Sequence, residues 1–281
     1  MEIITTVNRM QARSDQMRKD SQRIALVPTM GFFHEGHLSL MREGRKQGDD
    51  LVVSIFVNPT QFGPGEDLDS YPGNLERDFE LAKKENVDAV FVPDKQELYP
   101  ERFQTYVRQE KLPDHLCGLS RPVHFQGVTT VVTKLFNIIK PHVAVFGRKD
   151  YQQLIVIRQM VLDLNFDIEI IGSPTTRESD GLAMSSRNTF LTSRQRDSAL
   201  TLYQSLQTAQ KLVENGEKNS KTLIDTASNL IKSCPETDID YIAICDPDTL
   251  DDMAVIDRPA LMALAVKVGK TRLIDNMILR P

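Results

Sequence analysis

The stretch IALVPTMGFFHEGHLSLMREGRK, residues 24–46, predicts the start of an alternating α/β fold. The apolar run at 24–27 is typical of a buried strand, and residues 38–46 have the pattern of a helix. Between them stand His34 and His37, where the strand gives way to the helix. Histidines at such a point can cap the helix, bind a metal or hold an anion.

The same alternation of strands and helices continues outward from this stretch. Strands are predicted at 51–57, 89–92, 142–147 and 166–171, and helices at 74–86, 128–139 and 151–164. Helices between strands favour parallel pairing with right-handed crossovers, so we expect a doubly wound, Rossmann-like parallel sheet. The motifs PTMGFFHEGH, NPTQF and GRKD directly follow strands. They should therefore meet at the carboxyl edge of the sheet, where such folds bind ligands.

After residue 171 the pattern changes, which indicates a second, smaller α+β domain. Residues 172–190 read as a loop, and Thr192 with Gln195 has the spacing of a capping box at a helix start. Helices are expected at 193–214 and 221–233, and strands at 239–245, 260–268 and 272–279. We predict a first domain at 1–175 and a C-terminal lid domain at 176–281.

Composition narrows the possible classes of protein. The 281 residues are 40% hydrophobic and 26% charged, with a net charge of −5, which is ordinary for a globular protein and argues against a broad nucleic-acid surface. No apolar run is long enough to cross a bilayer, and no secretory signal is readable in the first twenty residues. The three cysteines are scattered, as expected for reduced thiols. We expect a cytoplasmic protein that binds neither nucleic acid nor membrane.

Two patterns in the chain resemble well-known motifs but do not match them. VGKT at 268–271 lacks the earlier glycine of a phosphate loop, because Leu264 stands there, and Gly269 is better explained as a hairpin turn. HEGH has its histidines three residues apart, whereas the zinc-protease motif needs four. No G-x-G-x-x-G stretch is present.

His34 and His37 have two interpretations that the residues alone leave open. Near a helix N-terminus, unpaired backbone N–H groups and the helix dipole favour an anion, and imidazoles there could bind phosphate. Gly31 and Gly36 would let a ligand approach the backbone. Alternatively, one histidine caps the turn and the other is an incidental surface residue.

Other polar positions are also candidates for an anion site. Cations at a helix N-terminus oppose the dipole, so Lys149 favours a bound polyanion, whereas Arg148 could simply face water. The serines and arginine of MSSRN, 184–188, suit phosphate contacts, although such turns are common on surfaces. The acidic, Gly- and Pro-rich segment 63–73 is either a mobile loop or a lid.

Five motifs in order give a family resemblance. PTMG-x-x-HEGH, FVNPTQF, RPVHFQGV, VFGRKDYQQ and RESDGLAMSSRN resemble the motif series of the pantothenate synthetases, ATP-dependent pantoate–β-alanine ligases. The resemblance runs from about residue 27 to residue 188. That family belongs with the nucleotidyltransferases that carry an H-x-G-H signature, which His34 and His37 match.

The resemblance implies a reaction and a set of site residues. Pantoate and β-alanine would be the substrates and ATP with Mg²⁺ the cofactors, and a pantoyl adenylate would form before AMP is released. His34, His37 and Lys149 would be catalytic. Pantoate would meet Asn58, Gln61 and Gln153, with Gln61 also near β-alanine. ATP would contact Met30, Gly31, His34, His37, Gly147, Arg148, Lys149, Asp150, Thr176, Met184, Ser185, Ser186 and Arg187.

Several points stay open at this stage. Asp150 is only one candidate for the metal, whose ligands are unassigned, and the family's common homodimer is an implication alone. Phe32, Phe33 and Thr176 depart from the residues expected at their positions, without removing a polar group that the chemistry needs. The rival readings are a nucleotidyltransferase that leaves a nucleotide on its product and a nucleotide-binding regulatory protein. A tRNA synthetase is disfavoured by the short, acidic chain.

Overall fold

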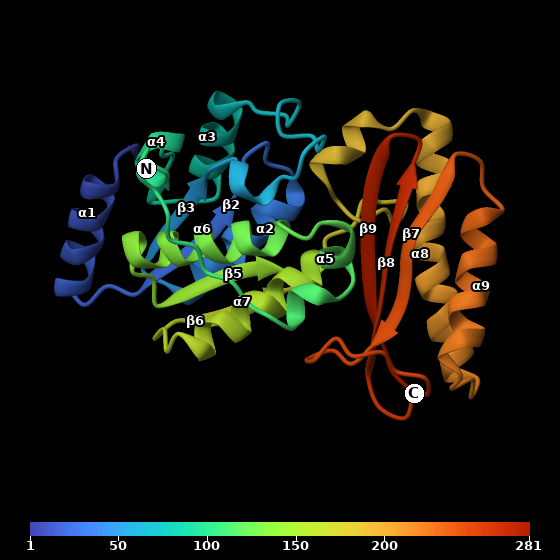
Figure 1. Cartoon of the computed structure of the whole chain (residues 1–281). Helices are drawn as coiled ribbons and strands as arrows, with labels where there is room; N and C mark the ends of the chain where they lie inside the picture. Colours follow the sequence, from blue (N-terminus) through green and yellow to red (C-terminus); the bar gives the residue numbers. More distant parts are fainter. The chain divides into compact units, whose positions relative to one another are not determined.

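The computed structural model describes residues 1–281, which form two compact units (Figure 1). Unit 1 comprises Met1–Glu110, Arg121–Arg148 and Gln153–Pro174, and unit 2 comprises Lys111–Ser120, Lys149–Gln152 and Thr175–Pro281. Two short segments, 111–120 and 149–152, thus pack with unit 2 although they precede residue 175. The predicted domain bounds, 1–175 and 176–281, stay a prediction.

Unit 1 is built on a parallel sheet, as predicted. Its strands are β1 (Glu2–Ile4), β2 (Ile24–Thr29), β3 (Asp50–Ile55), β4 (Ala89–Phe91), β5 (Val143–Gly147) and β6 (Glu169–Ser173). Their order across the 6-stranded sheet is β1-β4-β3-β2-β5-β6, and every pairing is parallel. From β2 the chain builds the sheet first toward β3 and later toward β5, so the order reverses between β2 and β5.

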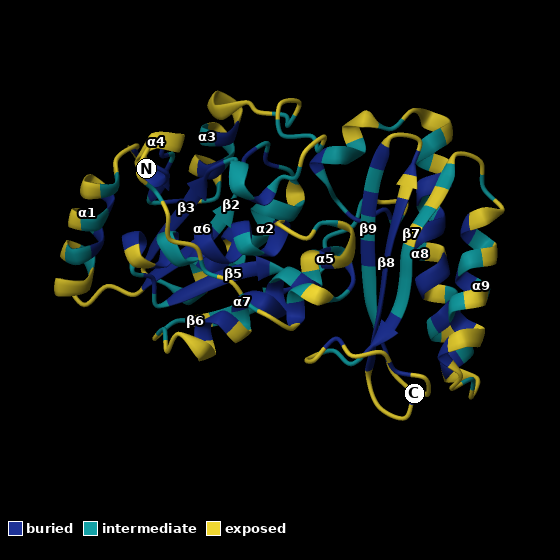
Figure 2. Cartoon of the chain, viewed as in Figure 1, coloured by how far each residue is buried: buried dark blue, intermediate teal, exposed yellow.

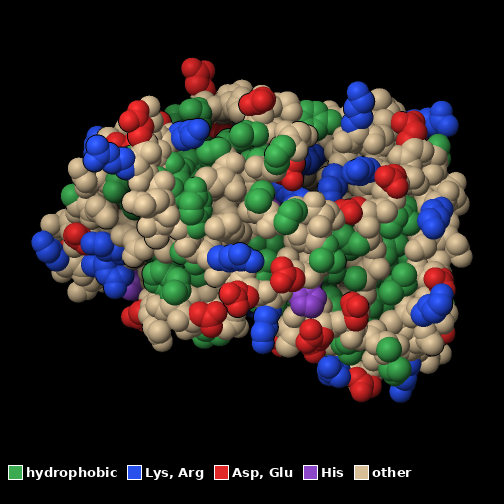
Figure 3. All heavy atoms as spheres, viewed as in Figure 1, with side chains coloured by type: hydrophobic (Ala, Val, Ile, Leu, Met, Phe, Trp, Pro, Cys, Tyr) green, Lys and Arg blue, Asp and Glu red, His purple; other side chains and the backbone are tan.

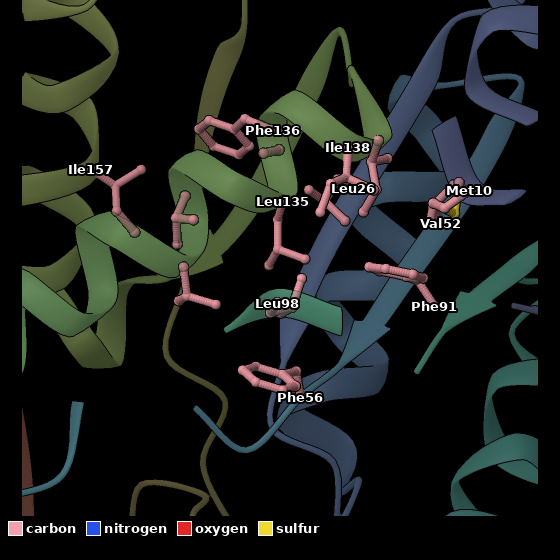
Figure 4. Packing of buried hydrophobic residues seen from close by; sticks show 14 of the residues in the cluster. Met10, Leu26, Val52, Phe56, Phe91, Leu98, Leu135, Phe136, Ile138 and Ile157 are labelled. Atoms are coloured by element: carbon pink, nitrogen blue, oxygen red, sulfur yellow. The ribbon is translucent and has the colours of Figure 1, made fainter. Parts of the chain in front are cut away.

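Helices cover both faces of this sheet. On one face lie α2 (Glu35–Gln47) and α3 (Leu75–Lys84), and on the other lie α1 (Val7–Lys19), α6 (His124–Ile139) and α7 (Tyr151–Asp163). Figure 4 shows the hydrophobic core on the face covered by α1, α6 and α7, where Met10, Leu135 and Ile157 pack against the strands. The middle strands are therefore buried on both faces (Figure 2). Continuous apolar runs such as LVVSIFV are the sequence signature of such strands.

Unit 2 contains a separate core. Strands β7 (Thr237–Cys245), β8 (Ala260–Val268) and β9 (Thr271–Leu279) form an antiparallel sheet in that order. Helices α8 (Ser193–Glu214) and α9 (Ser220–Lys232) contribute side chains to the same core. The capping box predicted at Thr192 and Gln195 is present, and Gly269 has a φ of +59° in the β8–β9 turn, which confirms the hairpin at VGKT.

Several short elements join or precede these. They are α4 (Lys95–Leu98), α5 (Cys117–Ser120) and the 3-10 turns η1 (Pro59–Gln61), η2 (Leu112–Asp114), η3 (Arg148–Asp150) and η4 (Ser186–Phe190). The sequence pattern did not predict β1, α1, α4 or α5. β1 is only 3 residues long, and α1 buries only Met10 and Ser14 on a polar helix, so neither has a clear apolar period.

The strand predicted at 166–171 begins later than expected, at Glu169. Asn165, with a φ of +55°, ends α7, and the N–H of Phe166 donates to the carbonyl of Val161 at 3.0 Å. This is a Schellman cap, and it uses Phe166 to close the helix, so pairing with β5 starts only beyond it.

The surface is mixed in charge. Figure 3 shows acidic and basic side chains interspersed over the visible face. No helix has the length and apolar character needed to span a membrane.

Candidate active site

The polar motifs of unit 1 follow neighbouring strands at the point where the sheet order reverses. β2 pairs with β3 on one side and β5 on the other. The segment that contains His34 follows β2, NPTQF follows β3, and Arg148 follows β5. Since all three strands are parallel, these segments lie at the same edge, as the sequence predicted.

His34 and His37 both form part of the N-terminus of α2. His34 is the N-cap, and its Nδ1 accepts the N–H of Gly36 at 3.2 Å, while Nδ1 of His37 accepts the N–H of His34 at 3.3 Å. The ring centroids are 4.1 Å apart. A neutral imidazole that accepts at Nδ1 carries its proton on Nε2. Capping therefore sets both rings in the tautomer that donates from Nε2, so capping and anion binding are compatible roles.

A buried carboxylate holds the turn that precedes these histidines. Asp78 is fully buried, and its two oxygens accept the N–H groups of Phe32 and Phe33, both at 2.7 Å. Gly31 and Phe32 have φ values of +86° and +54°. A side chain on Gly31 would lie 3.0 Å from Ile55 and 3.1 Å from Asp78. Glycine is thus required by the backbone here, and Asp78 stabilises the strained conformation of Phe32.

Replacing Asp78 with alanine is expected to lower the free energy of unfolding by about 2–6 kcal/mol, because two N–H groups lose their partner and each unpaired buried N–H costs about 1–3 kcal/mol. Urea unfolding of the variant and the parent protein would measure the difference. The exposed Asp69→Ala, in the loop before α3, is the control and should change stability by less than about 0.5 kcal/mol. Equal stability of Asp78→Ala and the parent would contradict this role for the carboxylate.

Asn58 and Gln61 form a buried amide pair after β3. Asn58 is 1% exposed and Gln61 is 8% exposed. Nδ2 of Asn58 donates to Oε1 of Gln61 at 3.1 Å and to the carbonyl of Gly127 at 3.0 Å. Nε2 of Gln61 in turn donates to Sδ of Met30 at 3.2 Å. These bonds orient Gln61 and bring three of the predicted ligand-binding residues into contact.

Two hydroxyls fix the orientation of Asn58. The hydroxyl of Tyr99 donates to Oδ1 of Asn58 at 2.9 Å, and so does Oγ1 of Thr60, also at 2.9 Å. Burial raises the pKa of Tyr99, so its hydroxyl keeps its proton at neutral pH. Tyr99 was not predicted from the sequence, because a tyrosine 41 residues from Asn58 gives no local signal.

The beginning of α6 supports the same turn. A side chain on Gly127 would clash with the carbonyl oxygen of Thr60, so only glycine lets α6 pack this closely on η1. His124 pairs through Nδ1 with the carbonyl of Gln61 at 2.9 Å. Arg121 binds both oxygens of Glu66, at 2.8 and 2.6 Å, and so tethers the 63–73 loop. RPVHFQGV is therefore a support for the amide pair, a role that its residue types alone did not reveal.

The GRKD segment divides between the two units. Arg148, in unit 1, donates from Nε to the carbonyl of Gly172 at 2.9 Å and braces β6. Lys149, in unit 2, is half-buried. Nε2 of Gln152 donates to the carbonyls of Leu112 and His115, and its Oε1 accepts the N–H of Cys117, at 2.7–2.9 Å. Its side chain is therefore structural. Gln153 is half-buried and is the glutamine of this motif that remains a candidate for substrate binding.

Residues 176–187 of unit 2 comprise a tight hairpin and the start of η4, and are called the 176–187 hairpin. The N–H of Met184 donates to the carbonyl of Thr176 at 3.0 Å, and that of Glu178 donates to Leu182 at 2.8 Å. Ser185 caps η4 by accepting the N–H of Arg187 at 3.3 Å. Arg196 binds Glu178 and Asp180 and holds the tip of the hairpin. Thr176 thus contributes to the hairpin through its main-chain carbonyl.

Lys149 and the hairpin share a small pocket in unit 2. Its lining residues are Lys149, Leu182, Ala183, Ser185, Asn188, Leu202, Leu273, Ile274 and Asp275. A lysine beside a serine at the start of a 3-10 turn is a suitable site for phosphate oxygens. Within unit 2, the structure therefore places Lys149 and Ser185 around the same pocket.

The family of the chain follows from its sequence match. The model of the family described as pantoate-beta-alanine ligase matches residues 2–278. The chain belongs to this family. It is therefore a ligase, and the rival readings of a nucleotidyltransferase and a regulatory protein are set aside.

Relatives match the chain over its full length. A pantothenate synthetase of Desulfatibacillum aliphaticivorans is 59% identical over 281 residues, which is 100% of both chains. The crystal structure of pantothenate synthetase from Thermus thermophilus has a TM-score of 0.95 at 41% identity and covers 100% of both chains. A pantoate-beta-alanine ligase from Francisella tularensis, complexed with beta-gamma ATP and beta-alanine, has a TM-score of 0.81 at 33% identity, with 99% and 97% covered.

Proposed function

We propose that the chain condenses pantoate with β-alanine to pantothenate, with ATP converted to AMP and pyrophosphate. The observation that supports this most strongly is the family match over residues 2–278. The site residues are consistent with it, because unit 1 presents imidazole and amide donors and unit 2 presents a lysine, serines and an arginine. Such groups position and stabilise a triphosphate, which is the main task in phosphoryl transfer.

In the first proposed step, a pantoate carboxylate oxygen attacks the α-phosphorus of ATP. The bond from that phosphorus to the oxygen of the β-phosphate breaks, and pyrophosphate leaves. Nε2 donors of His34 and His37, with Lys149 and Arg187, would stabilise the charge that develops on the phosphate oxygens. The amides of Gln61 and Gln153 suit the hydroxyls of pantoate, and Asn58, whose own amide is bonded within the protein, orients Gln61, so the pantoate carboxylate is left to react.

In the second proposed step, the neutral amine of β-alanine attacks the carbonyl carbon of the pantoyl adenylate. The bond from that carbon to the phosphate oxygen breaks, AMP leaves, and the nitrogen loses a proton to solvent. Formation of the adenylate removes the negative charge that makes a free carboxylate resist an amine. Gln61 is the residue we place near both substrates. Water must be kept from the adenylate, a role we assign to the 63–73 loop and the C-terminal domain.

We propose that Mg²⁺ accompanies the ATP. No group of three or more His, Cys, Asp or Glu side chains is arranged to hold a metal by itself. We therefore propose that the Mg²⁺ is held largely by the phosphate oxygens of ATP, which it prefers as ligands. Asp150 is the one carboxylate that we would test as a protein ligand. Bound there, the ion would neutralise charge on the triphosphate.

Two further expectations from the family resemblance remain proposals. We propose that the protein forms a homodimer, which sedimentation analysis would test, since a single monomeric species at micromolar concentration would contradict it. We also propose that it acts in the cytoplasm, where ATP is available to it. Cell fractionation would test the location.

The reaction is tested by product formation in mixtures that lack one component at a time. Pantothenate, detected by mass spectrometry, should form only when ATP, Mg²⁺, pantoate and β-alanine are all present. AMP should appear in equal amount. Formation of ADP in place of AMP, or of a product that retains the nucleotide, would contradict the proposed reaction.

A further inference from the structure

β9 carries two adjacent polar residues that contact separate segments of the proposed ATP site. The first is Asp275, which is 3% exposed and binds the guanidinium of Arg177 through both oxygens, at 2.6 and 2.9 Å. That guanidinium also lies 3.8 Å from the centroid of the Tyr203 ring. A buried, bidentate and stacked arginine has little freedom. The residue after Thr176 is thus fixed to both β9 and α8.

The second residue is Asn276, which follows Asp275 in the strand. Successive residues of a strand point to opposite faces, so Asn276 leaves the sheet on the other side from Asp275. Its Nδ2 donates to the main-chain carbonyl of Lys149 at 2.8 Å, and its own N–H donates to Oδ1 of Asp275, also at 2.8 Å. One short stretch of β9 therefore contacts both the 176–187 hairpin and Lys149.

The hydrogen bond from Asn276 to the carbonyl of Lys149 helps to set the direction of the Lys149 side chain. Lys149 lies in the 3-10 turn η3, between the end of β5 and the start of α7. A bond to its carbonyl fixes the peptide plane after Lys149 and with it the direction of the Cα–Cβ bond. Small errors in the placement of a group that acts on the transition state reduce the rate steeply.

We propose that Asn276 is a positioning residue for Lys149, and that β9 aligns this lysine with the 176–187 hairpin. The inference rests on the proposed role of Lys149 at the ATP phosphates. Asn276 itself does not contact the reacting atoms in this account. It acts through the lysine, so its loss should impair adenylate formation without unfolding unit 2, since the Asp275–Arg177 pair is retained.

The test compares Asn276→Ala and Asn276→Asp with the parent protein in pantoate-dependent exchange of pyrophosphate into ATP. We expect the exchange rate to fall by between about 10-fold and 10²-fold in both variants, because both lack the amide donor. The apparent KM for β-alanine in the full reaction and the melting temperature should be unchanged. Asn229→Ala, at an exposed position of α9, is the matched control and should exchange at the parent rate.

A double-mutant cycle separates this role from a general structural one. If Asn276 acts through Lys149, adding Asn276→Ala to Lys149→Ala should cause no further loss of exchange. A full additional loss in the double variant, or near-parent exchange in Asn276→Ala, would overturn the inference. If Lys149→Ala alone keeps the parent rate, the proposed role of Lys149 fails, and the inference about Asn276 falls with it.

Discussion

The variant Lys149→Ala is expected to form pantothenate with a kcat at least about 10²-fold below that of the parent protein, as is common when a donor that stabilises transition-state charge is removed. Lys149 follows β5 at the edge of the sheet and lines a pocket together with Ser185. It carries a positive charge at the start of α7, where the helix dipole disfavours a cation unless an anion is bound. Steady-state kinetics with saturating substrates would measure the loss.

Two comparisons sharpen this expectation. Lys270→Ala, at the exposed β8–β9 turn, removes a lysine from the VGKT stretch and should keep the parent kcat. Lys149→Arg keeps the charge but changes its shape, and it should recover part of the lost rate. A Lys149→Ala variant with the parent kcat would remove this residue from the ATP site.

Loss of the imidazole in His37→Ala is expected to lower kcat by about 10²-fold as well. The reason is that the two ring nitrogens have different functions. Nδ1 accepts the backbone N–H of His34, so the ring proton is on Nε2, which we assign to the phosphates. Alanine removes both functions together, so this variant should also lose some stability.

Substitution by the two side-chain amides separates the functions of His37. Asn places a polar atom near the position of Nδ1 and can cap the helix, whereas Gln reaches the position of Nε2. His37→Asn should therefore regain the melting temperature of the parent protein but not its kcat, and His37→Gln should regain more of the rate. Recovery of kcat by Asn alone would mean that His37 serves only as a cap.

Much of both sheets could be predicted from the sequence because most of their strands are short, continuous apolar runs bounded by helical patterns or turn residues. β8 was predicted at its observed bounds, 260–268, and the hairpin at Gly269 followed from one glycine between two such runs. β1 and α1 were missed, since a 3-residue strand and a helix with two buried residues carry no detectable period. An element can therefore be predicted from the sequence when it buries enough residues to give a clear apolar pattern.

The candidate site was predicted in its motifs but not in its supports. His34, Asn58 and Lys149 lie in long, specific motifs, so the family resemblance makes them candidates. Asp78 and Tyr99 contact these segments from positions far along the chain and look ordinary in sequence. Asn276 is a further example, 127 residues from Lys149. Supports of this kind become visible only when the fold brings distant segments together.

The central claim is that pantoate is activated as an adenylate before β-alanine reacts. The most direct measurement is exchange of labelled pyrophosphate into ATP by the purified protein, with Mg²⁺ and pantoate present and β-alanine omitted. We expect exchange that depends on pantoate and that falls by at least about 10²-fold in Lys149→Ala. Exchange that occurs only when β-alanine is present would contradict formation of the adenylate before β-alanine reacts. So would a protein that makes pantothenate but shows no exchange.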